Sequence, residues 1–361
     1  MSGDMRKLRA AILLLCLCAP QLRAGTGTTA LPFLKLDQGA RPAAMGGAYC
    51  AAGDDAWSVF YNPAGAALAQ KQEIALAHNE WLQGMRNESA VYEGPYGPDA
   101  TIFAGLNALF SGAMDKLDVT GAGIGSFSSQ EGALSLGAAA ALGGGYYGGA
   151  ALKGLYQRTT VGSAYAWAGD AGLLRVEGDW RFGLSAANFG TKMKLGSTGF
   201  SLPLMLRAGV AWNYLERLTI TADGVKAGES AAAPAVGAEG EIPTGPDGAF
   251  YLRAGYTGGR SRFTGSGVTA GLGLRNGDLR VDYAFAPYGE LGDAHRITIA
   301  VRFGGERQKA QKRHYYAPRR KAVKNAPAPG SSGPAKAKTA PARKKAGAAK
   351  NGDDKSVYFM W

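Results

Sequence analysis

The chain has 361 residues, of which 46% are hydrophobic and only 19% are charged. Its 55 glycines are about double the usual share of roughly 7% and show no Gly-X-Y period, which excludes a collagen-like chain and argues against a helical bundle. The net charge of +12 is confined to the end, because fifteen Lys and Arg residues from Gly304 onward face only three acidic ones.

Residues 1–24 are typical of a secretory signal peptide. A basic stretch (6–9) precedes a short apolar run (10–19), and a cleavage site follows at Ala24. The apolar run is shorter than the roughly 20 residues of a membrane-spanning helix. A lipoprotein anchor is the weaker alternative, because Cys16 and Cys18 both follow Leu where such a motif needs a small residue.

Residues 25–71 form a segment rich in small residues, with Trp57, Phe60 and Tyr61 clustered together. Cys50 is the one cysteine left after the signal peptide is removed, so no intramolecular disulfide is possible. We expect this segment to be compact and the thiol of Cys50 to be free and buried.

Residues 72–303 consist of about fourteen short runs in which apolar and polar residues alternate. Side chains alternate sides along a strand, so each run has one apolar face. The turn sequences Asn276-Gly277 and Leu215-Glu216 predict tight hairpins between runs. The last run, from His295, is predicted to be the closing strand, and its apolar face carries Ile297, Ile299, Val301 and Phe303.

Three features favour a transmembrane antiparallel β-barrel over a soluble sandwich with the same alternation. The signal peptide indicates export, Trp and Tyr recur at the ends of the runs, and the last run ends in Phe303. Only a closed ring of strands satisfies all backbone groups inside a bilayer. The charged residues on the polar faces are expected to line the lumen and to pair with one another: Arg207, Asp223, Arg253, Arg280, Asp282, Arg296 and Arg302.

Residues 39–68 read GARPAAMGGAYCAAGDDAWSVFYNPAGAAL, which resembles the N-terminal motif of the PorV/PorQ family within the wider FadL-like group of outer-membrane barrels. Weaker matches continue to Phe303. The resemblance implies a barrel of about 14 strands with a small N-terminal hatch (25–71) inside its lumen. The motif residues would either bind a ligand there or only wedge the hatch in place: Gly39, Arg41, Met45, Gly46, Gly47, Asp54, Asp55, Asn62, Pro63, Ala64 and Gly65.

The resemblance implies two functions for a protein of the outer membrane, with membrane lipid around it. PorV-like proteins serve type IX protein secretion, with secretion-system proteins or secreted cargo as partners, and this is the favoured prediction. FadL-like proteins instead pass hydrophobic molecules through the hatch and out sideways.

The basic tail, residues 304–361, suggests a third role. Its Lys, Ala and Pro content predicts a disordered segment. After export it would contact peptidoglycan, anionic lipid or an acidic periplasmic partner, and so tether the outer membrane to the cell wall.

Catalytic chemistry has little support in the sequence. The three histidines, His78, His295 and His314, are far apart and lack clustered cysteines or carboxylates, so no metal site is predicted. The glycine-rich stretches lack the residues of a phosphate-binding loop, so no cofactor is predicted either. We expect a protein that is not an enzyme and, since it is exported, has no nucleic-acid partner.

Overall fold

The computed structural model describes residues 29–214, 217–260 and 262–307. The predicted signal peptide (1–24), the turn at Leu215-Glu216 and nearly all of the predicted tail lie outside the described residues. The chain divides into two units, Met1–Gln311 and Lys312–Trp361, and only the first contains described residues.

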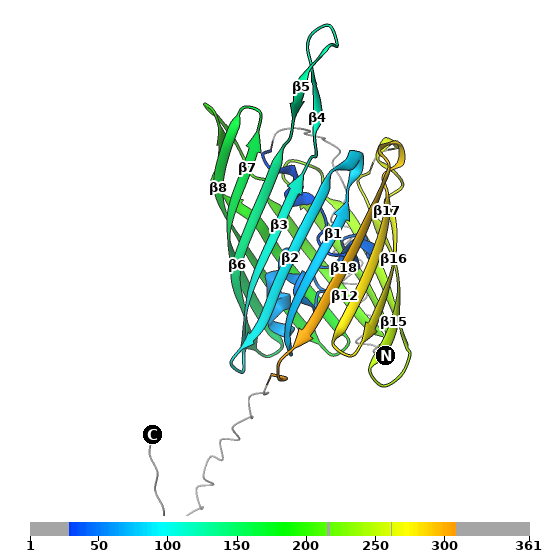
Figure 1. The fold of residues 1–361 in the computed structure, drawn as a ribbon. Helices are drawn as coiled ribbons and strands as arrows, with labels where there is room; N and C mark the ends of the chain where they lie inside the picture. The colour runs from blue at the N-terminus through cyan, green and yellow to red at the C-terminus, as the bar shows by residue number, and fades with distance from the viewer. Residues whose placement is uncertain (1–28, 215–216, 261, 308–361) are drawn as a thin grey trace, which may run out of the picture. The chain divides into compact units, whose positions relative to one another are not determined.

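Fourteen strands form one closed antiparallel barrel, which confirms the predicted fold class (Figure 1). The last strand pairs with the first, from Gln72 opposite Phe303 to Glu80 opposite His295, so the predicted closing strand does close the ring. The barrel strands are β1 (Gln72–Glu80), β2 (Arg86–Tyr96), β3 (Ala100–Phe110), β6 (Gln130–Gly143), β7 (Tyr146–Thr159), β8 (Gly162–Glu177), β9 (Trp180–Gly190), β12 (Met205–Tyr214), β13 (Leu218–Ala227), β14 (Ala233–Pro243), β15 (Gly248–Thr257), β16 (Val268–Asn276), β17 (Leu279–Pro287) and β18 (Asp293–Phe303).

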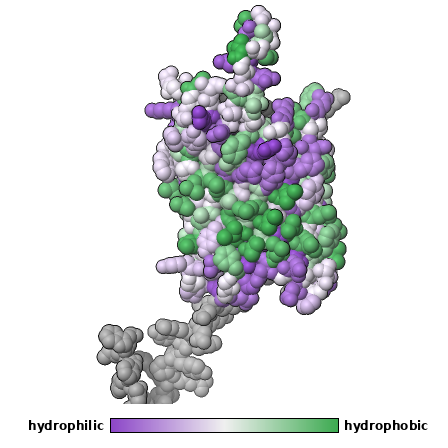
Figure 2. Space-filling model, in the orientation of Figure 1, coloured by the Kyte–Doolittle hydropathy of each residue, from purple (hydrophilic) through white to green (hydrophobic). Residues whose placement is uncertain are grey.

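The outer face of the barrel carries an apolar band. On β18, Ile297, Ile299 and Val301 are exposed, while Arg296 and Thr298, which alternate with them, are buried in the lumen. Figure 2 shows this band across the lower part of the face in view, with hydrophilic residues above and below it. A ring of apolar side chains facing outward, with every strand paired, is the arrangement that a bilayer requires.

Aromatic residues border the apolar band at the end of the barrel where β18 finishes. Trp180 and Trp212 face each other on neighbouring strands and stack with their ring centroids 5.7 Å apart. Phe182 and Tyr214 extend the same cluster. Aromatic side chains are enriched at membrane–water interfaces, so this cluster fits the girdle expected from the sequence.

The connections differ between the two ends of the barrel. One end has short turns such as residues 97–99 and 144–145, whereas the other has longer connections. These include the hairpins β4 (Met114–Leu117) with β5 (Gly123–Phe127) and β10 (Met193–Leu195) with β11 (Thr198–Phe200), and the first rises beyond the rim (Figure 1). Short turns are typical of the periplasmic end, so β1 begins and β18 ends on the periplasmic side.

The predicted Asn276-Gly277 turn is centred one residue later than the sequence suggested. Asn276 still pairs with Leu279, so Gly277 and Asp278 are the central residues, and only Gly277 has a positive φ, of 60°. A positive φ at the first central position alone is the type II′ pattern, which demands glycine there.

The segment before β1 lies inside the barrel as short helical turns (Figure 1). We call its described residues, 29–71, the hatch. Its elements are η1 (Pro32–Lys35), α2 (Ala40–Ala44), η2 (Ala56–Phe60) and η3 (Pro63–Leu68). Three further turns, η4 (Leu82–Gly84), η5 (Arg262–Thr264) and η6 (Gly289–Leu291), belong to the extracellular connections. Among the described residues, no helix has the length and apolar character to cross a membrane.

Lumen-facing glycines of the wall allow the hatch to approach the strands closely. A Cβ added at Gly183 would lie 2.3 Å from the carbonyl oxygen of Cys50, and one at Gly149 would lie 2.4 Å from the backbone of Pro63. Either contact would force the backbone apart. We call the wall glycines that abut the hatch in this way the glycine belt: Gly105, Gly149, Gly172, Gly183, Gly237, Gly255 and Gly271.

Candidate functional site

The glycines of the sequence motif shape the hatch. Gly39, Gly46 and Gly47 have φ values of 78°, 65° and 76°, a region that side chains rarely adopt. Gly39 also lies against the indole of Trp57, where a Cβ would be 2.5 Å from the ring. Met45 is fully buried against Gly237 of the belt. These positions are needed for packing.

Arg41 connects the hatch to the barrel wall. Its guanidinium donates to Glu239 on β14, at 2.6 and 2.8 Å, and to Asp54 and Asp55 of the hatch, at 2.6 and 3.0 Å. Burial opposes the charge on Arg41, yet Glu239 and the neighbouring acidic groups raise its pKa well above the ordinary value. The cation is therefore a permanent centre that holds three carboxylates from two parts of the fold.

The pairing continues along the wall on the periplasmic side of Arg41. Glu239 also accepts from Arg253 at 2.6 Å, and Arg253 and Arg280 both bind Asp282, each at 2.9 Å. Arg181 joins from β9 through Asp54, at 3.1 Å. We call this set the ionic cluster: Arg41, Asp54, Asp55, Arg181, Glu239, Arg253, Arg280 and Asp282. Its mixed charges brace the hatch and the wall. Of the seven charged residues expected from the sequence to pair with one another, only Arg253, Arg280 and Asp282 do so in the described part of the chain.

The Asn-Pro-Ala stretch of the motif wedges the hatch against β8. The side chain of Asn62 accepts from the N–H of Ala64, at 3.1 Å, and donates to the carbonyl oxygens of Cys50 and Leu173, at 2.8 and 3.0 Å. Pro63 occupies the first turn of η3, where a missing N–H costs nothing. Every polar atom of Asn62 is thus used within the protein, and its amide approaches the wall at the belt residue Gly172.

One part of the extracellular half of the lumen is an apolar cluster, which was not predicted from the sequence. Leu31 and Phe33 at the start of the hatch are almost completely buried among inward-facing alanines of β8. Barrel interiors are usually polar, so this region is a departure from the ordinary pattern. We call it the upper apolar cluster: Ala30, Leu31, Phe33, Ala133, Leu155, Ala164, Ala166, Ala168, Met193 and Leu202.

A small enclosed cavity lies between the upper apolar cluster and the rest of the hatch. Its volume is about 20 Å³, and its lining includes Leu34, Phe60, Tyr61, Lys153 and Arg207. A cavity that binds benzene in a protein core is about 150 Å³, so this space does not admit an aromatic hydrocarbon. Passage through the lumen therefore requires the hatch or its neighbours to move.

The wall is irregular beside this cavity. The pairing of β8 with β9 shifts near Asp170. Asn188 on β9, which has a positive φ of 63°, therefore has no regular partner on β8. Lys153 binds Asp170 at 2.6 Å and Asn188 at 2.9 Å, and Asp170 accepts from the N–H of Asn188 at 2.8 Å. We call this place the wall bulge. β-Bulges interrupt a ladder locally and often mark functional sites in barrels.

A lipid-facing groove lies on the outside of the wall next to the bulge. Its volume is about 570 Å³, and it is lined by the exposed Leu173, Leu184 and Leu206 with small residues between them. Gly172 and Arg207 contribute to this outer groove, and Arg207 also lines the inner cavity. The two spaces are thus separated by one layer of strands.

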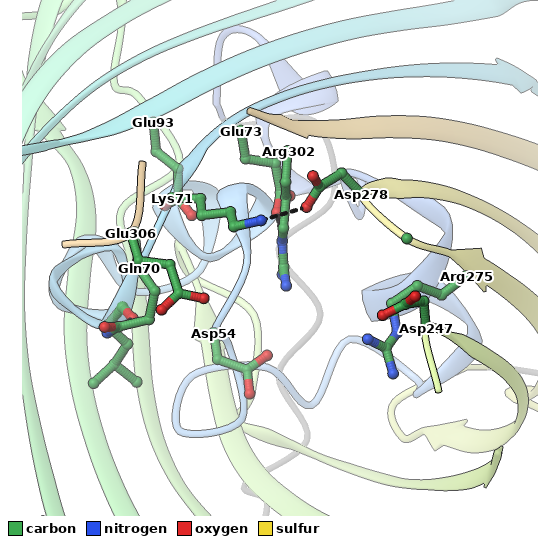
Figure 3. A pocket seen from close by; sticks show the side chains of 13 residues that line it. Asp54, Gln70, Lys71, Glu73, Glu93, Asp247, Arg275, Asp278, Arg302 and Glu306 are labelled. Atoms are coloured by element: carbon green, nitrogen blue, oxygen red, sulfur yellow. Dashed lines mark hydrogen bonds and ion pairs between the residues drawn. The ribbon is translucent and has the colours of Figure 1, made fainter. Parts of the chain in front are cut away.

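The periplasmic end of the lumen has a different character. A pocket of about 570 Å³, which we call the mouth pocket, opens between the end of the hatch and the short turns (Figure 3). Its side chains are mainly charged, among them Lys71, Glu73 and Arg302. A hydrophobic molecule leaving in this direction would have to displace water from charged groups, which is unfavourable.

The residues that distinguish these regions were mostly missed in the sequence. Phe33, Lys153 and Glu93 were not singled out, because each acts through neighbours far away in the chain. The sequence of β8 did contain one indication of the upper apolar cluster. Its lumen-facing positions Ala164, Ala166 and Ala168 are apolar, although the opposite, outward face carries aromatic residues.

The comparisons with known proteins support the fold. No protein-family model matches the sequence, and no curated protein aligns with it significantly. The Ralstonia pickettii toluene transporter TbuX is similar in structure, with a TM-score of 0.51 and 14% identity over 75% of this chain and 100% of that one. The P. putida toluene transporter TodX is also similar, with a TM-score of 0.53 and 12% identity over 74% of this chain and 98% of that one.

These likenesses concern the fold alone, because the identities are so low. The closed 14-strand barrel is a fold that the chain shares with these transporters, and nothing in the comparisons singles out the predicted PorV/PorQ family. The barrel architecture and its apolar outer band place the protein in the outer membrane.

Proposed function

We propose that this protein carries small hydrophobic molecules across the outer membrane. The observation that supports the proposal best is the upper apolar cluster, an apolar region inside a barrel at its extracellular half. A polar solute would gain nothing from such a lining, whereas an apolar solute would exchange water for it favourably.

The route we propose leaves the lumen sideways at the wall bulge. The charged mouth pocket disfavours an apolar solute, while the apolar outer groove lies directly across the wall from the inner cavity. The similarity to TodX and TbuX, which are toluene transporters, makes monoaromatic hydrocarbons the first substrates to test. The resemblance to FadL-like barrels implies the same kind of path.

The secretion role of PorV/PorQ type and the tether role of the basic tail stay predictions. The described residues offer no observation that favours either over solute passage. Recovery of secretion proteins together with the intact chain from outer membranes would support the secretion role. Recovery of cell-wall fragments would support the tether role.

A reversible lock between hatch and wall tests the proposed function. The Sγ of Cys50 lies 3.8 Å from the hydroxyl oxygen of Ser185 on β9, so Ser185→Cys creates a pair close enough to form a disulfide. Labelled toluene uptake would be measured in a Gram-negative host that lacks such channels. We expect oxidation to reduce the uptake rate of the variant several-fold, and reduction to restore it.

The matched control is Ser185→Cys combined with Cys50→Ser, which loses the same hydroxyl of Ser185 and cannot form the bond. The uptake rate of this control should not change on oxidation. If the wild-type protein gives no more uptake than host cells without it, the proposed function is wrong. If the oxidised lock transports normally, the route does not require the hatch to move at this point.

A further inference from the structure

The mouth pocket has more acidic than basic residues in its lining. The described residues that line it include six carboxylates and three cations (Figure 3). Its charged residues are Asp54, Lys71, Glu73, Glu93, Asp247, Arg275, Asp278, Arg302 and Glu306.

The three cations of the pocket are already engaged. Lys71 binds Asp278 at 2.8 Å, as Figure 3 shows, and Arg302 binds Glu73 at 2.6 Å. Arg275 binds Glu241 outside the pocket at 3.2 Å. None of the three is left to neutralise the remaining carboxylates.

Glu93 is the most informative of those remaining groups. Its side chain comes from β2, is only 2% exposed, and lines the pocket. Within the described part of the chain it has no ion-pair partner, and its Oε2 is buried without a hydrogen bond. Burial without a partner disfavours the charged form of Glu93, so a cation that binds there would favour the carboxylate and would itself be held by it.

Asp247 and Glu306 supply two further carboxylates in the lining of the pocket. Neither has an ion-pair partner among residues 29–214, 217–260 and 262–307, and they lie in a periplasmic turn and just after β18. No group of three or more metal-ligating side chains occurs in those residues, so the carboxylates are too dispersed to share one metal ion. Dispersed carboxylates suit a long ligand with several separate positive charges.

We propose that the mouth pocket binds an extended organic polycation through Glu93, Asp247 and Glu306. The ligand chemistry is a flexible chain bearing amino or guanidino groups, each forming a charge-assisted hydrogen bond with one carboxylate. The pocket volume of about 570 Å³ is in the range of small-molecule sites. This proposal does not depend on the proposed transport of hydrophobic molecules.

Two sources could supply this chemistry. One is a free polyamine in the periplasm. The other is the Lys- and Arg-rich sequence that follows Arg307 in the same chain. Arg307 itself is fixed at the mouth, where its backbone N–H donates to Gln70 and its guanidinium donates to the carbonyl oxygens of Ala67 and Ala100, at 2.7 to 2.9 Å.

Binding of spermine to the purified full chain would test the site, with calorimetry as the readout. A protease site inserted after Arg307 lets the same folded sample be measured before and after removal of the basic segment. Spermine should bind the cleaved protein, and putrescine should bind much more weakly because it cannot reach separated carboxylates. Glu93→Gln should weaken spermine binding about tenfold, the effect of one charge-assisted contact.

Asp247→Asn is a second variant, on an exposed turn where folding is not at risk, and it should also weaken binding. Glu290→Gln, an exposed carboxylate of the extracellular η6, is the control and should leave binding unchanged. Binding before and after cleavage would identify free polyamines as the ligand, and binding only after cleavage would identify the chain's own basic segment. The proposal is overturned if the cleaved protein does not bind spermine, or if Glu93→Gln and Asp247→Asn bind it as the wild-type protein does.

Discussion

The upper apolar cluster is held by apolar contacts, whereas the ionic cluster on the periplasmic side of the hatch is held by ion pairs. Phe33 and its neighbours in the upper apolar cluster interact without fixed partners, so a solute of similar character can replace them. Arg41 and the carboxylates around it have fixed geometry, and separating them leaves buried charges unpaired. The hatch is therefore anchored at its periplasmic side and able to yield at its extracellular side.

The largest effect should follow from removing the anchor. Arg41→Ala leaves Glu239, Asp54 and Asp55 without their shared cation, which should lower the free energy of unfolding by about 3–5 kcal/mol. Urea-induced unfolding in lipid vesicles, followed by tryptophan fluorescence, would measure the loss. The control Arg86→Ala removes an exposed arginine and should cost less than about 1 kcal/mol. Equal losses in the two variants would contradict the anchoring role of the ionic cluster.

A somewhat smaller loss is expected in the apolar half. Phe33→Ala removes a side chain that is 1% exposed and should lower the free energy of unfolding by about 3 kcal/mol. Because the resulting space is apolar, saturating toluene should restore part of the stability by binding to the folded variant. The same addition should not rescue Arg41→Ala. Failure of toluene to stabilise Phe33→Ala would show that the upper apolar cluster collapses instead of accommodating a solute.

The smallest effect concerns the pH dependence of the anchor. Desolvation opposes the charge on Asp54, yet Arg41 and Arg181 hold its pKa well below the ordinary range. A depressed pKa stabilises the fold above the unfolded value of about 4, and this contribution is lost as the pH falls below that value. Asp54→Asn should therefore cost about 1 kcal/mol at pH 7, discounted because the side chain is a third exposed.

Unfolding measured between pH 7 and pH 2 would check this expectation. The stability difference between Asp54→Asn and the wild-type protein should narrow below about pH 4. A constant difference across that range would mean that hydrogen bonding, and not the charge of Asp54, holds it in the cluster. Asp293→Asn, an exposed acidic residue at the start of β18, should have no effect at any pH.

The sequence revealed the wall of the barrel far better than its contents. The bilayer imposes a period of two on every strand, so Ile297, Ile299 and Val301 identified their strand and its outward face locally. Phe33 carries no such pattern, because most of the wall residues that bury it follow a hundred or more positions later. The wall bulge was equally hidden, since Lys153, Asp170 and Asn188 meet only once three strands are paired.

The sequence motif predicted the position of the hatch but left its role open between ligand binding and wedging. Arg41 and Asn62 have all their polar atoms engaged with the protein, and this favours wedging for these two residues. That outcome depends on Glu239 and Leu173, which lie more than 100 residues away. A motif shows which residue types are present, whereas the partners of their polar atoms appear only in the folded barrel.

The glycine belt has a consequence for modularity. Seven wall positions match the path of this one hatch, and an alanine at four of them would collide with the hatch backbone: Gly149, Gly183, Gly237 and Gly255. A hatch from a related barrel would follow a different path and meet a wall shaped for another insert. The hatch and the wall are therefore complementary in shape, and their sequences must change together in evolution. Grafting either part alone into another barrel should yield a misassembled hybrid.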